Sequence, residues 1–487
     1  MNAVTVLLTP GTGDLAAMVA QAARLLPSEQ VGPIVVFAPP GWSEGSGPGS
    51  VRIVPVSDPG ASEAVMPLLE NLATPYLLHL EGDVDPHPGA LARMVDAAED
   101  AGAILVYGDY LDRVGDRLAP HPLSDCQPGS LEDRFPLGPM RLWSLAAARR
   151  AWAACGHTPP DLAFHAWYDL RLRGSRVAPA LHLPEPLAAW APPSDRTSGQ
   201  AVFDYLTAAR ARQDEAERVC TAHLEAVGAR LRGPFRPYEP SGAFPVEASV
   251  VIPVRDRVRT VGEAVDSALG QEAPFAFNVI VVDNHSTDGT SVLLSARAAA
   301  DPRLLHVVPA RRDLGIGGCW NEALAHPACG RWAVQLDSDD LYADAHTLAR
   351  MVGCLVSERA ALAVGSYTTV DRSLAPLPPG LVDHREWTAE NGPNNALRVG
   401  GLGAPRAFAT EVVRRHPFPN VSYGEDYAVA LRISREWRVG RVWDSVYLCR
   451  RWEDNTDADL PPEVTARHQA FKDRIRTIEL GARRGTR

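Results

Sequence analysis

The sequence is almost devoid of lysine, because Lys472 is the single lysine in 487 residues and the other basic residues are arginines. Acidic residues outnumber basic ones by 59 to 48, which gives a formal net charge of -11, and no basic block stands out. Proteins that bind nucleic acid or anionic lipid through charge carry clustered basic residues. The composition therefore predicts no nucleic-acid partner and no charged membrane-surface contact.

Long apolar runs and paired cysteines are lacking as well. No apolar run reaches the roughly 18 residues that a membrane span needs. The N-terminal residues MNAVTVLLTPGTGD lack the basic start and long apolar stretch of a signal peptide. The seven cysteines form no C-x-x-C pair, which is typical of reduced thiols. We expect a cytoplasmic protein without an integral membrane segment.

The chain is too long for one hydrophobic core, so its length predicts two domains. Apolar residues make up 46% of the sequence and charged residues 22%, which is the balance of an ordinary globular protein.

Strand and helix patterns alternate through the second half of the chain. Apolar runs typical of buried strands are followed by apolar residues at helical spacing, and the strands are expected at 249–254, 278–283, 304–308 and 332–336. Ser286 or Thr287 is expected to cap the helix after the second strand. Such alternation predicts an α/β fold with a mostly parallel, Rossmann-like sheet flanked by helices.

The first half repeats this order, with strands expected at 5–10, 33–38, 51–56 and 76–80. Three pairs of segments are also similar in sequence, namely HLEGDVDPHPGALARMV with QLDSDDLYADAHTLARMV, YLDRVGDRLAP with TTVDRSLAP, and MRLWSLAAARRA with PRAFATEVVRRH. The matched segments stay about 250 to 260 residues apart, which indicates an internal duplication.

The domain boundaries follow from this repeat. We expect a first domain at 1–200, a helix with a Pro/Gly-rich linker at 201–247, a second domain at 248–460, and a helix at 461–487 that closes the second copy.

Asp337-Ser338-Asp339-Asp340 directly follows the buried strand WAVQL. Ligands of α/β folds bind at the carboxyl ends of such strands. Crowded carboxylates are tolerable when a hard cation such as Mg²⁺ or Mn²⁺ neutralises them and binds phosphate oxygens. The motif therefore indicates a metal-bound diphosphate, and the alternative is a solvated turn.

About residues 248–457 resemble the family 2 glycosyltransferases, whose fold is the nucleotide-sugar-binding GT-A fold. The resemblance rests on five motifs in the family's order, namely VVIPVRDR, VIVVDNHSTDGT, DLGIGGCWNEAL, LDSDD and SYGEDYAVALR. It implies two tandem GT-A-like domains with a degenerate first copy. It also implies an inverting, metal-dependent transfer of a hexosyl-type sugar from a nucleotide-diphosphate sugar, with UDP-sugars favoured.

The resemblance assigns roles to individual residues. Asp426 is expected as the catalytic base, with Glu425 as the second choice. The expected metal ligands are Asp339, Asp337 and Glu453. The expected donor-binding residues are Pro253, Arg255, Asp283, Asn321, Asp337, Arg450 and Arg451.

Each role has a structural alternative. Asp283 can cap a turn instead of reading the base or ribose. Glu425 and Asp426 can simply favour a helix N-terminus, an effect of about 0.3 to 1 kcal/mol. Arg450 and Arg451 can form surface ion pairs.

The sequence departs from the family pattern at two points. The segment 449–457 contains no histidine for the metal, so Glu453 or Asp454 would have to replace it. Trp320 stands where the family commonly has arginine. The polar, Gly-rich stretch 384–408 is expected to be a flexible acceptor loop, in which Trp387 either stacks on a sugar or packs.

The first half lacks the residues of a working site. It has Phe37 and Ala38 in place of Asp283, and Ala166 and Trp167 in place of the catalytic pair, while Glu81, Asp83 and Asp85 keep part of the metal motif. His165 or Asp169 would serve only under a shifted alignment. We expect this half to bind acceptor, to mediate association or to cover the second domain.

Three rival functions remain open. They are a non-catalytic carbohydrate- or peptide-binding pseudoenzyme, a bifunctional polysaccharide polymerase, and a nucleotidyltransferase, which the glycine-free PVRDRVRT disfavours. The acceptor is a glycan, a peptide or a small metabolite, and a homodimer is left open.

Overall fold

The computed structural model describes most of the chain, namely residues 4–9, 20–21, 31–40, 45–46, 51–191, 210–451 and 460–485. The chain forms two compact units. Unit 1 comprises residues 1–230 together with 459–487, and unit 2 comprises residues 231–458.

Unit 2 is built on a sheet of nine described strands in the order β13-β12-β11-β14-β18-β16-β19-β15, with β17 paired to β16. These strands are β11 Ala248–Val254, β12 Phe277–Asp283, β13 Leu304–Val307, β14 Trp332–Gln335, β15 Leu341–Tyr342, β16 Leu362–Val370, β17 Pro376–Val382, β18 Arg406–Ala409 and β19 Val439–Arg450. The first four pair in parallel, and β18 joins β14 and β16 in antiparallel fashion. The α/β prediction is confirmed, with a sheet that becomes mixed after the acidic motif.

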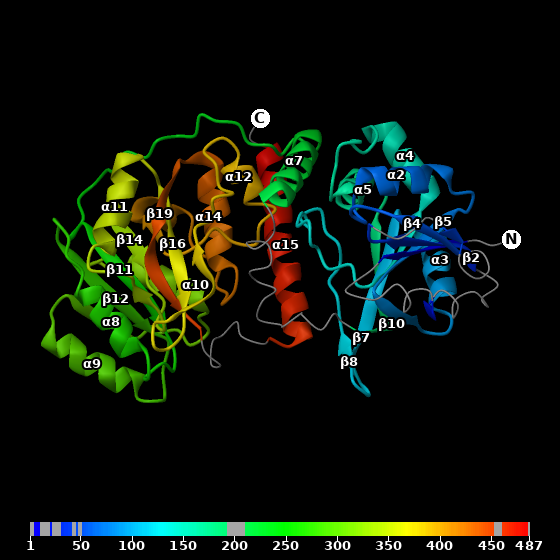
Figure 1. Ribbon diagram of the computed structural model, residues 1–487. Coiled ribbons are helices and arrows are strands. Elements are labelled where there is room, and N and C mark those ends of the chain that lie inside the picture. The colour runs from blue at the N-terminus through cyan, green and yellow to red at the C-terminus, as the bar shows by residue number, and fades with distance from the viewer. Residues whose placement is uncertain are drawn as a thin grey trace. The chain divides into compact units, whose positions relative to one another are not determined.

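Helices cover the sheet of unit 2 (Figure 1). They are α8 Val261–Leu269, α9 Thr290–Ala300, α10 Ile316–Ala325, α11 Thr347–Ser357, α12 Gly392–Asn395, α13 Thr410–Arg415 and α14 Glu425–Glu436. Apolar side chains at helical spacing face the sheet, as Val261, Ala264, Val265 and Ala268 of α8 do. The central strands β11 and β12 are buried over almost their whole length, as expected when helices cover both faces.

Unit 1 is built on a sheet of ten described strands in the order β3-β4-β2-β1-β5-β9-β7-β10-β6, with β8 paired to β7. The strands are β1 Val4–Thr9, β2 Val31–Ala38, β3 Gly45–Ser46, β4 Val51–Pro55, β5 Tyr76–Glu81, β6 Asp83–Pro86, β7 Leu105–Val114, β8 Arg117–His121, β9 Met140–Ser144 and β10 Ala180–Ala191. Its helices are α2 Ser62–Asn71, α3 Ala90–Ala101, α4 Leu145–Cys155, α5 Ala166–Gly174, α7 Arg210–Ala226 and α15 Pro462–Arg484.

The two sheets have the same strand order. Apart from β3, the sequence β4-β2-β1-β5-β9-β7-β10-β6 matches β13-β12-β11-β14-β18-β16-β19-β15 position by position. Parallel and antiparallel pairings also agree, since β5 and β9 pair in antiparallel fashion as β14 and β18 do, and β7 and β10 pair in parallel as β16 and β19 do.

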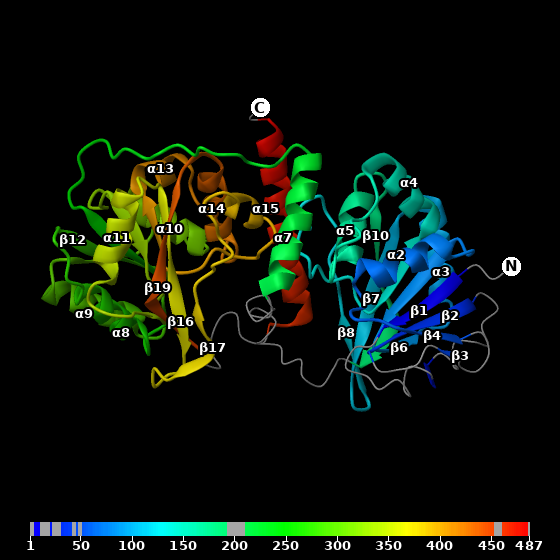
Figure 2. The same ribbon diagram turned by 45° about the horizontal axis from the view of Figure 1, so that its top comes forward.

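Helix α15 belongs to unit 1, which corrects the expectation that it closes the second copy. Ser130 Oγ donates to Asp473 Oδ2 at 2.7 Å, and Arg476 pairs with both Asp473 and Glu132. Arg476 and Asp473 are fully buried, so these ionic bonds require that partner surface. In Figures 1 and 2, α15 runs beside α7 of the same unit.

Among the helices that the structure describes, none has the length and apolar character that crossing a bilayer demands. All seven cysteines are free thiols.

Candidate functional site

The acidic motif of unit 2 lies in the loop after β14, at the carboxyl end of that strand. Gln335 Nε2 donates to both carboxylate oxygens of Asp337, at 3.0 and 3.1 Å, and the backbone N–H of Asp337 donates to the Tyr447 hydroxyl at 3.0 Å. Asp340 Oδ1 accepts a bond from the backbone N–H of Arg450 at 2.8 Å. Strand β19 therefore holds both ends of the motif.

The carboxyl groups of Asp337 and Asp340 are harder to ionise than that of a free aspartate. Burial and the charge of Asp339 raise the pKa of Asp337, and burial with the charges of Asp339 and Asp337 raises the pKa of Asp340 well above its usual range. The Nε of Arg257 lies 3.9 Å from Asp339 Oδ2, and the Nε of Arg450 donates to the backbone oxygen of Asp339. Within the described residues no three His, Cys, Asp or Glu side chains converge on one metal position, and Glu453 lies outside that part of the chain.

The catalytic pair predicted from the sequence opens helix α14. Glu425 is 8% exposed, and burial together with the charge of Asp426 raises its pKa to about 8. Glu425 Oε2 is buried and has no hydrogen-bond partner within the described part of the chain. The Asp426 side chain is 29% exposed and forms an ion pair with Arg406. The two neighbouring carboxyl groups thus have different environments.

Arg406 was missed in the sequence, although it brings the two acidic segments together. It opens β18, and its Nη1 donates to Asp426 Oδ2 while its Nε donates to Gln335 Oε1 at 3.1 Å. The stretch GLGAPRAF gave no signal for this role, because an arginine at the start of a short strand is ordinary.

Asp283 ends β12 and is fully buried. Its Oδ1 accepts a bond from the backbone N–H of Ser286 at 2.9 Å, and its Oδ2 lies 3.2 Å from His306 Nε2 and accepts from Ser291 Oγ. Burial opposes ionisation, but these bonds lower the pKa of Asp283. The carboxylate therefore orders the turn after β12, which is the structural alternative stated for it.

The neighbouring Asn284 has an acceptor available. Its backbone N–H donates to Val254 O and its Nδ2 donates to Leu314 O, both at 2.8 Å. Its Oδ1 is buried without a hydrogen-bond partner among the described residues. A buried, unsatisfied carbonyl oxygen at the carboxyl ends of β11 and β12 suits a ligand that donates an N–H.

The predicted helix cap is wrong. Helix α9 begins at Thr290 after Gly289, with no side-chain cap. Ser286 Oγ instead accepts from the backbone N–H of Asp256 at 2.9 Å, and the backbone N–H of Thr287 donates to Asp256 Oδ1 at 2.7 Å. These bonds tie the turn after β12 to the turn after β11.

The other predicted residues of the first turn lie at its rim. Pro253 stands in β11 opposite Val282 of β12. Arg255 is mostly exposed, with its Nε 3.7 Å from Asp256 Oδ2. Both residues therefore lie at the same edge of the sheet as Asp283. Neither forms a described ion pair or hydrogen bond with the side chains of Asp337, Asp339 or Asp340.

Asn321 and the glycines of α10 serve close packing. Asn321 Nδ2 donates to Phe418 O at 2.9 Å, and its Oδ1 accepts from Phe418 N at 3.0 Å, so its amide is occupied by the chain before α14. A Cβ on Gly317 would lie 2.0 Å from Pro419 O. Trp320 is buried and stacks on Phe418 with ring centroids 5.1 Å apart, which accounts for tryptophan at this position.

Arg450 is an internal residue of the site. Its guanidinium is buried, pairs with Glu263, and donates from Nε to Asp339 O at 2.5 Å. It fixes the acidic loop, which is a structural role beside the predicted contact with a diphosphate, and that contact stays a prediction. Arg451 ends the described stretch before residues 452–459 and is half-buried.

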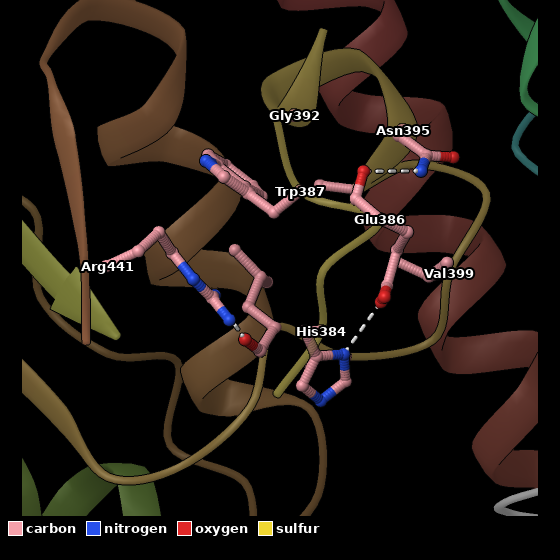
Figure 3. Close-up of a pocket in the computed structure, with 10 residues that line it drawn as sticks. His384, Glu386, Trp387, Gly392, Asn395, Val399 and Arg441 are labelled. Atoms are coloured by element: carbon pink, nitrogen blue, oxygen red, sulfur yellow. Dashed lines mark hydrogen bonds and ion pairs between the residues drawn. The ribbon is translucent and has the colours of Figure 1, made fainter. Parts of the chain in front are cut away.

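The predicted acceptor loop is a folded segment with a small pocket, seen in Figure 3. His384 Nδ1 lies 2.8 Å from Glu386 Oε1, and Arg441 crosses to the segment from β19. Trp387 is buried, and a Cβ on Gly392 would lie 2.5 Å from its ring. Trp387 therefore packs, and glycine is required beneath it.

Unit 1 carries counterparts of these acidic residues in a different setting. Arg141 of β9 donates to Glu81 Oε2 at 2.5 Å. Arg113 lies 3.2 Å from Asp85 Oδ2 and 3.9 Å from Asp83 Oδ2. Two guanidinium groups thus neutralise the partial motif.

The reserve candidates of unit 1 are engaged elsewhere. His165 Nδ1 lies 2.9 Å from Glu215 Oε1 of α7, and Asp169 accepts a bond from Arg173 Nε at 2.6 Å. Both side chains are buried. His165 links the start of α5 to α7, Asp169 pairs within α5, and the two do not form a carboxylate pair like that of α14.

Comparison with known proteins gives one match to a family model and a set of similar solved structures. Residues 249–408 match the family model described as glycosyl transferase family 2. No curated protein matches the chain.

Three solved structures illustrate the similarity. TarS 1-349 of S. aureus shares 20% identity over 49% of this chain and 71% of its own, with a TM-score of 0.35. The mannosyltransferase PcManGT from Pyrobaculum calidifontis shares 20% identity over 58% of this chain and 85% of its own, with a TM-score of 0.34. Glucosyl-3-phosphoglycerate synthase from Mycobacterium tuberculosis shares 19% identity over 51% and 87%, with a TM-score of 0.35.

Proposed function

Since residues 249–408 match the family model of glycosyl transferase family 2, we propose that unit 2 transfers a sugar from a nucleotide-diphosphate sugar to an acceptor nucleophile. The observation that carries the proposal is the convergence of Asp337, Arg406 and Asp426 from three separate segments. We further propose that transfer inverts the anomeric carbon and that the sugar is a hexosyl-type group.

Asp426 is the proposed base. Its side chain is partly exposed and forms an ion pair with the guanidinium of Arg406. Glu425 is buried with a pKa of about 8, so it holds its proton at neutral pH and cannot accept another. The proton of the acceptor hydroxyl would pass to Asp426 as the oxygen attacks the anomeric carbon.

A divalent cation, Mg²⁺ or Mn²⁺, fits the acidic motif. Asp337 and Asp339 are the proposed ligands. Burial and the charge of Asp339 raise the pKa of Asp337, and a hard cation would favour the ionised form of both carboxyl groups. Glu453 is proposed as a further ligand. When bound, the cation would act as a Lewis acid on the departing diphosphate.

The nucleotide is proposed to occupy the carboxyl ends of β11 and β12. The unsatisfied Oδ1 of Asn284 can accept an imide N–H of a base, while Asp283 holds the turn and keeps lone pairs for a ribose hydroxyl. Pro253 and Arg255 would border the nucleotide. Arg257, 3.9 Å from Asp339, and Arg451 are proposed to face the phosphates.

Unit 1 is proposed to be a second, non-catalytic copy of the same fold. The identical strand order and the arginines on its acidic residues support this proposal. A UDP-sugar is the favoured donor, and a glycan, a peptide or a small metabolite the acceptor. The seven free thiols support a cytoplasmic location.

A donor screen by isothermal titration calorimetry tests the function. UDP-, GDP- and dTDP-sugars are titrated with Mn²⁺ into the wild type, Asp339→Ala and Asp83→Ala. We expect one metal-dependent site that Asp339→Ala abolishes and the matched unit 1 variant Asp83→Ala retains. Absence of binding by every donor, or binding indifferent to Asp339, would reject the proposal.

A further inference from the structure

Arg406 links two parts of the site that are far apart in the sequence. Its side chain is 11% exposed. The backbone N–H and the Nε of Arg406 both donate to Gln335 Oε1, at 3.2 and 3.1 Å, and its Nη1 donates to Asp426 Oδ2. Because guanidinium donors point in fixed directions, these bonds fix where the Asp426 carboxylate lies relative to β14.

Gln335 extends the link to the acidic motif. Its Nε2 donates to Asp337 Oδ1 and Oδ2, at 3.0 and 3.1 Å. A carboxylate only accepts hydrogen bonds and a guanidinium only donates them, so the amide of Gln335 has a single orientation that satisfies both neighbours. Asp337, Gln335, Arg406 and Asp426 thus form one continuous chain of hydrogen bonds.

The charges along this chain support its persistence. Burial opposes the charge of Arg406, but the nearby Asp426, Asp337 and Glu425 carboxyl groups raise the pKa of its guanidinium. A cation shared in this way attracts the carboxylates on both sides of it.

Unit 1 provides an internal control for the arginine. Arg141 lies on β9 opposite His79 of β5. Arg406 holds the equivalent place on β18, one residue beyond Ala407, which pairs with Val334 of β14. Arg141 donates to Glu81, the acidic residue at the end of its own neighbouring strand. The sheet therefore accepts an arginine here without any bond to a helix carboxylate, so the bond to Asp426 is specific to unit 2.

We propose that Arg406 and Gln335 are positioning residues, which hold the base Asp426 at a fixed place relative to the donor-binding carboxylate Asp337. The inference rests on the proposed transferase function. It predicts that breaking the link slows turnover without weakening donor binding, because a displaced base misses the acceptor oxygen while the nucleotide contacts stay intact.

Steady-state kinetics of the full chain test this proposal. We expect Arg406→Gln to lower kcat by about 10- to 100-fold, while the donor KM changes by less than about 3-fold. Arg406→Lys keeps the positive charge but lacks the planar set of guanidinium donors, so its kcat should lie between those of Arg406→Gln and the wild type. Arg141→Gln in unit 1 is the matched control and should leave kcat unchanged.

A double variant separates positioning from general damage. If Arg406 acts through Asp426, Arg406→Gln combined with Asp426→Asn should be no slower than Asp426→Asn alone. Circular dichroism and thermal melting verify that each variant folds. If Arg406→Gln does not fold, Arg406→Lys and Gln335→Met carry the same comparison.

Three results would overturn the inference. The first is an unchanged kcat in Arg406→Gln. The second is a double variant whose loss of kcat equals the product of the losses in Arg406→Gln and Asp426→Asn. The third is a raised donor KM with a normal kcat, which would mean that Arg406 contacts the donor. Wild-type protein without turnover on any nucleotide sugar would reject the proposed function itself and the inference with it.

Discussion

The two units have the same sheet order but treat their acidic residues differently. In unit 1 the arginines of the sheet and of the β7–β8 hairpin neutralise Glu81, Asp83 and Asp85 directly. In unit 2 the corresponding arginine, Arg406, donates to the helix carboxylate of Asp426, and the Asp337 carboxylate accepts from the amide of Gln335. A shared fold therefore preserves the scaffold, whereas chemistry depends on where a few cations point.

The largest expected effect is on activity, and it comes from the carboxylate at the start of helix α14 in unit 2 and not from the acidic residues of unit 1. Asp426→Asn should lower kcat by about 1000-fold, because the acceptor hydroxyl loses its general base. A radiometric or coupled nucleotide-release assay measures this. Glu81→Gln in unit 1 is the control and should keep full activity, and equal losses in both variants would mean that both units work.

Metal binding should distinguish the acidic motifs by about 100-fold in Kd, because a guanidinium pairs with Glu81 in unit 1, whereas the Asp337 carboxylate in unit 2 accepts bonds from the neutral amide of Gln335. Electron paramagnetic resonance of Mn²⁺ should count one ion per wild-type chain. Asp339→Asn should remove it and Asp83→Asn should not. Two ions per chain would contradict the contrast between the units.

The close-packing glycines should behave alike in stability and differently in activity. A Cβ at Gly60 would lie 2.2 Å from Phe164 O before α5, and one at Gly317 lies 2.0 Å from Pro419 O before α14. Alanine at either site should destabilise the chain by about 1 to 3 kcal/mol in urea unfolding.

Only Gly317→Ala should also reduce kcat, since it displaces the segment that leads to Glu425 and Asp426. A similar loss of activity in Gly60→Ala would imply that unit 1 supports the site.

The last expected effect concerns pH and stability, and it requires no change in activity. The pKa of Glu425 is raised to about 8 in the folded protein, so its contribution to stability is complete below the unfolded value near 4.5 and is lost as the pH rises through 8. Glu425→Gln should remove a slope of at most about 1.4 kcal/mol per pH unit in this window. Urea unfolding between pH 5 and 9 measures it, and an unchanged slope would assign the effect to Asp337 and Asp340.

Strand positions could be predicted from the sequence because buried apolar runs have a local signature. The runs at 249–254 and 278–283 became β11 and β12 with shifts of one residue at most. The acidic motif and the Glu425–Asp426 pair could be predicted because they stand directly beside apolar runs, the motif after a strand and the pair at the start of a helix.

Long-range polar contacts could not be predicted. Arg406 meets Asp426 and Gln335 only after β18 inserts between β14 and β16. The family resemblance assigns Arg450 to the donor, but it gives no sign that the guanidinium is buried and paired with Glu263. Trp387 and the stretch around it read as a loop, since a tryptophan packed on Gly392 has no local pattern.

The position of α15 has a consequence for synthesis of the protein. Unit 1 obtains its last helix from residues 462–484, which leave the ribosome after all of unit 2. Until then Ser130 and Glu132 lack the buried partners Asp473 and Arg476. Domains generally fold as they emerge from the ribosome, so unit 2 can fold before unit 1 is complete. Residues 1–230, which are synthesised first, then remain an incomplete folding intermediate until helix α15 has been synthesised.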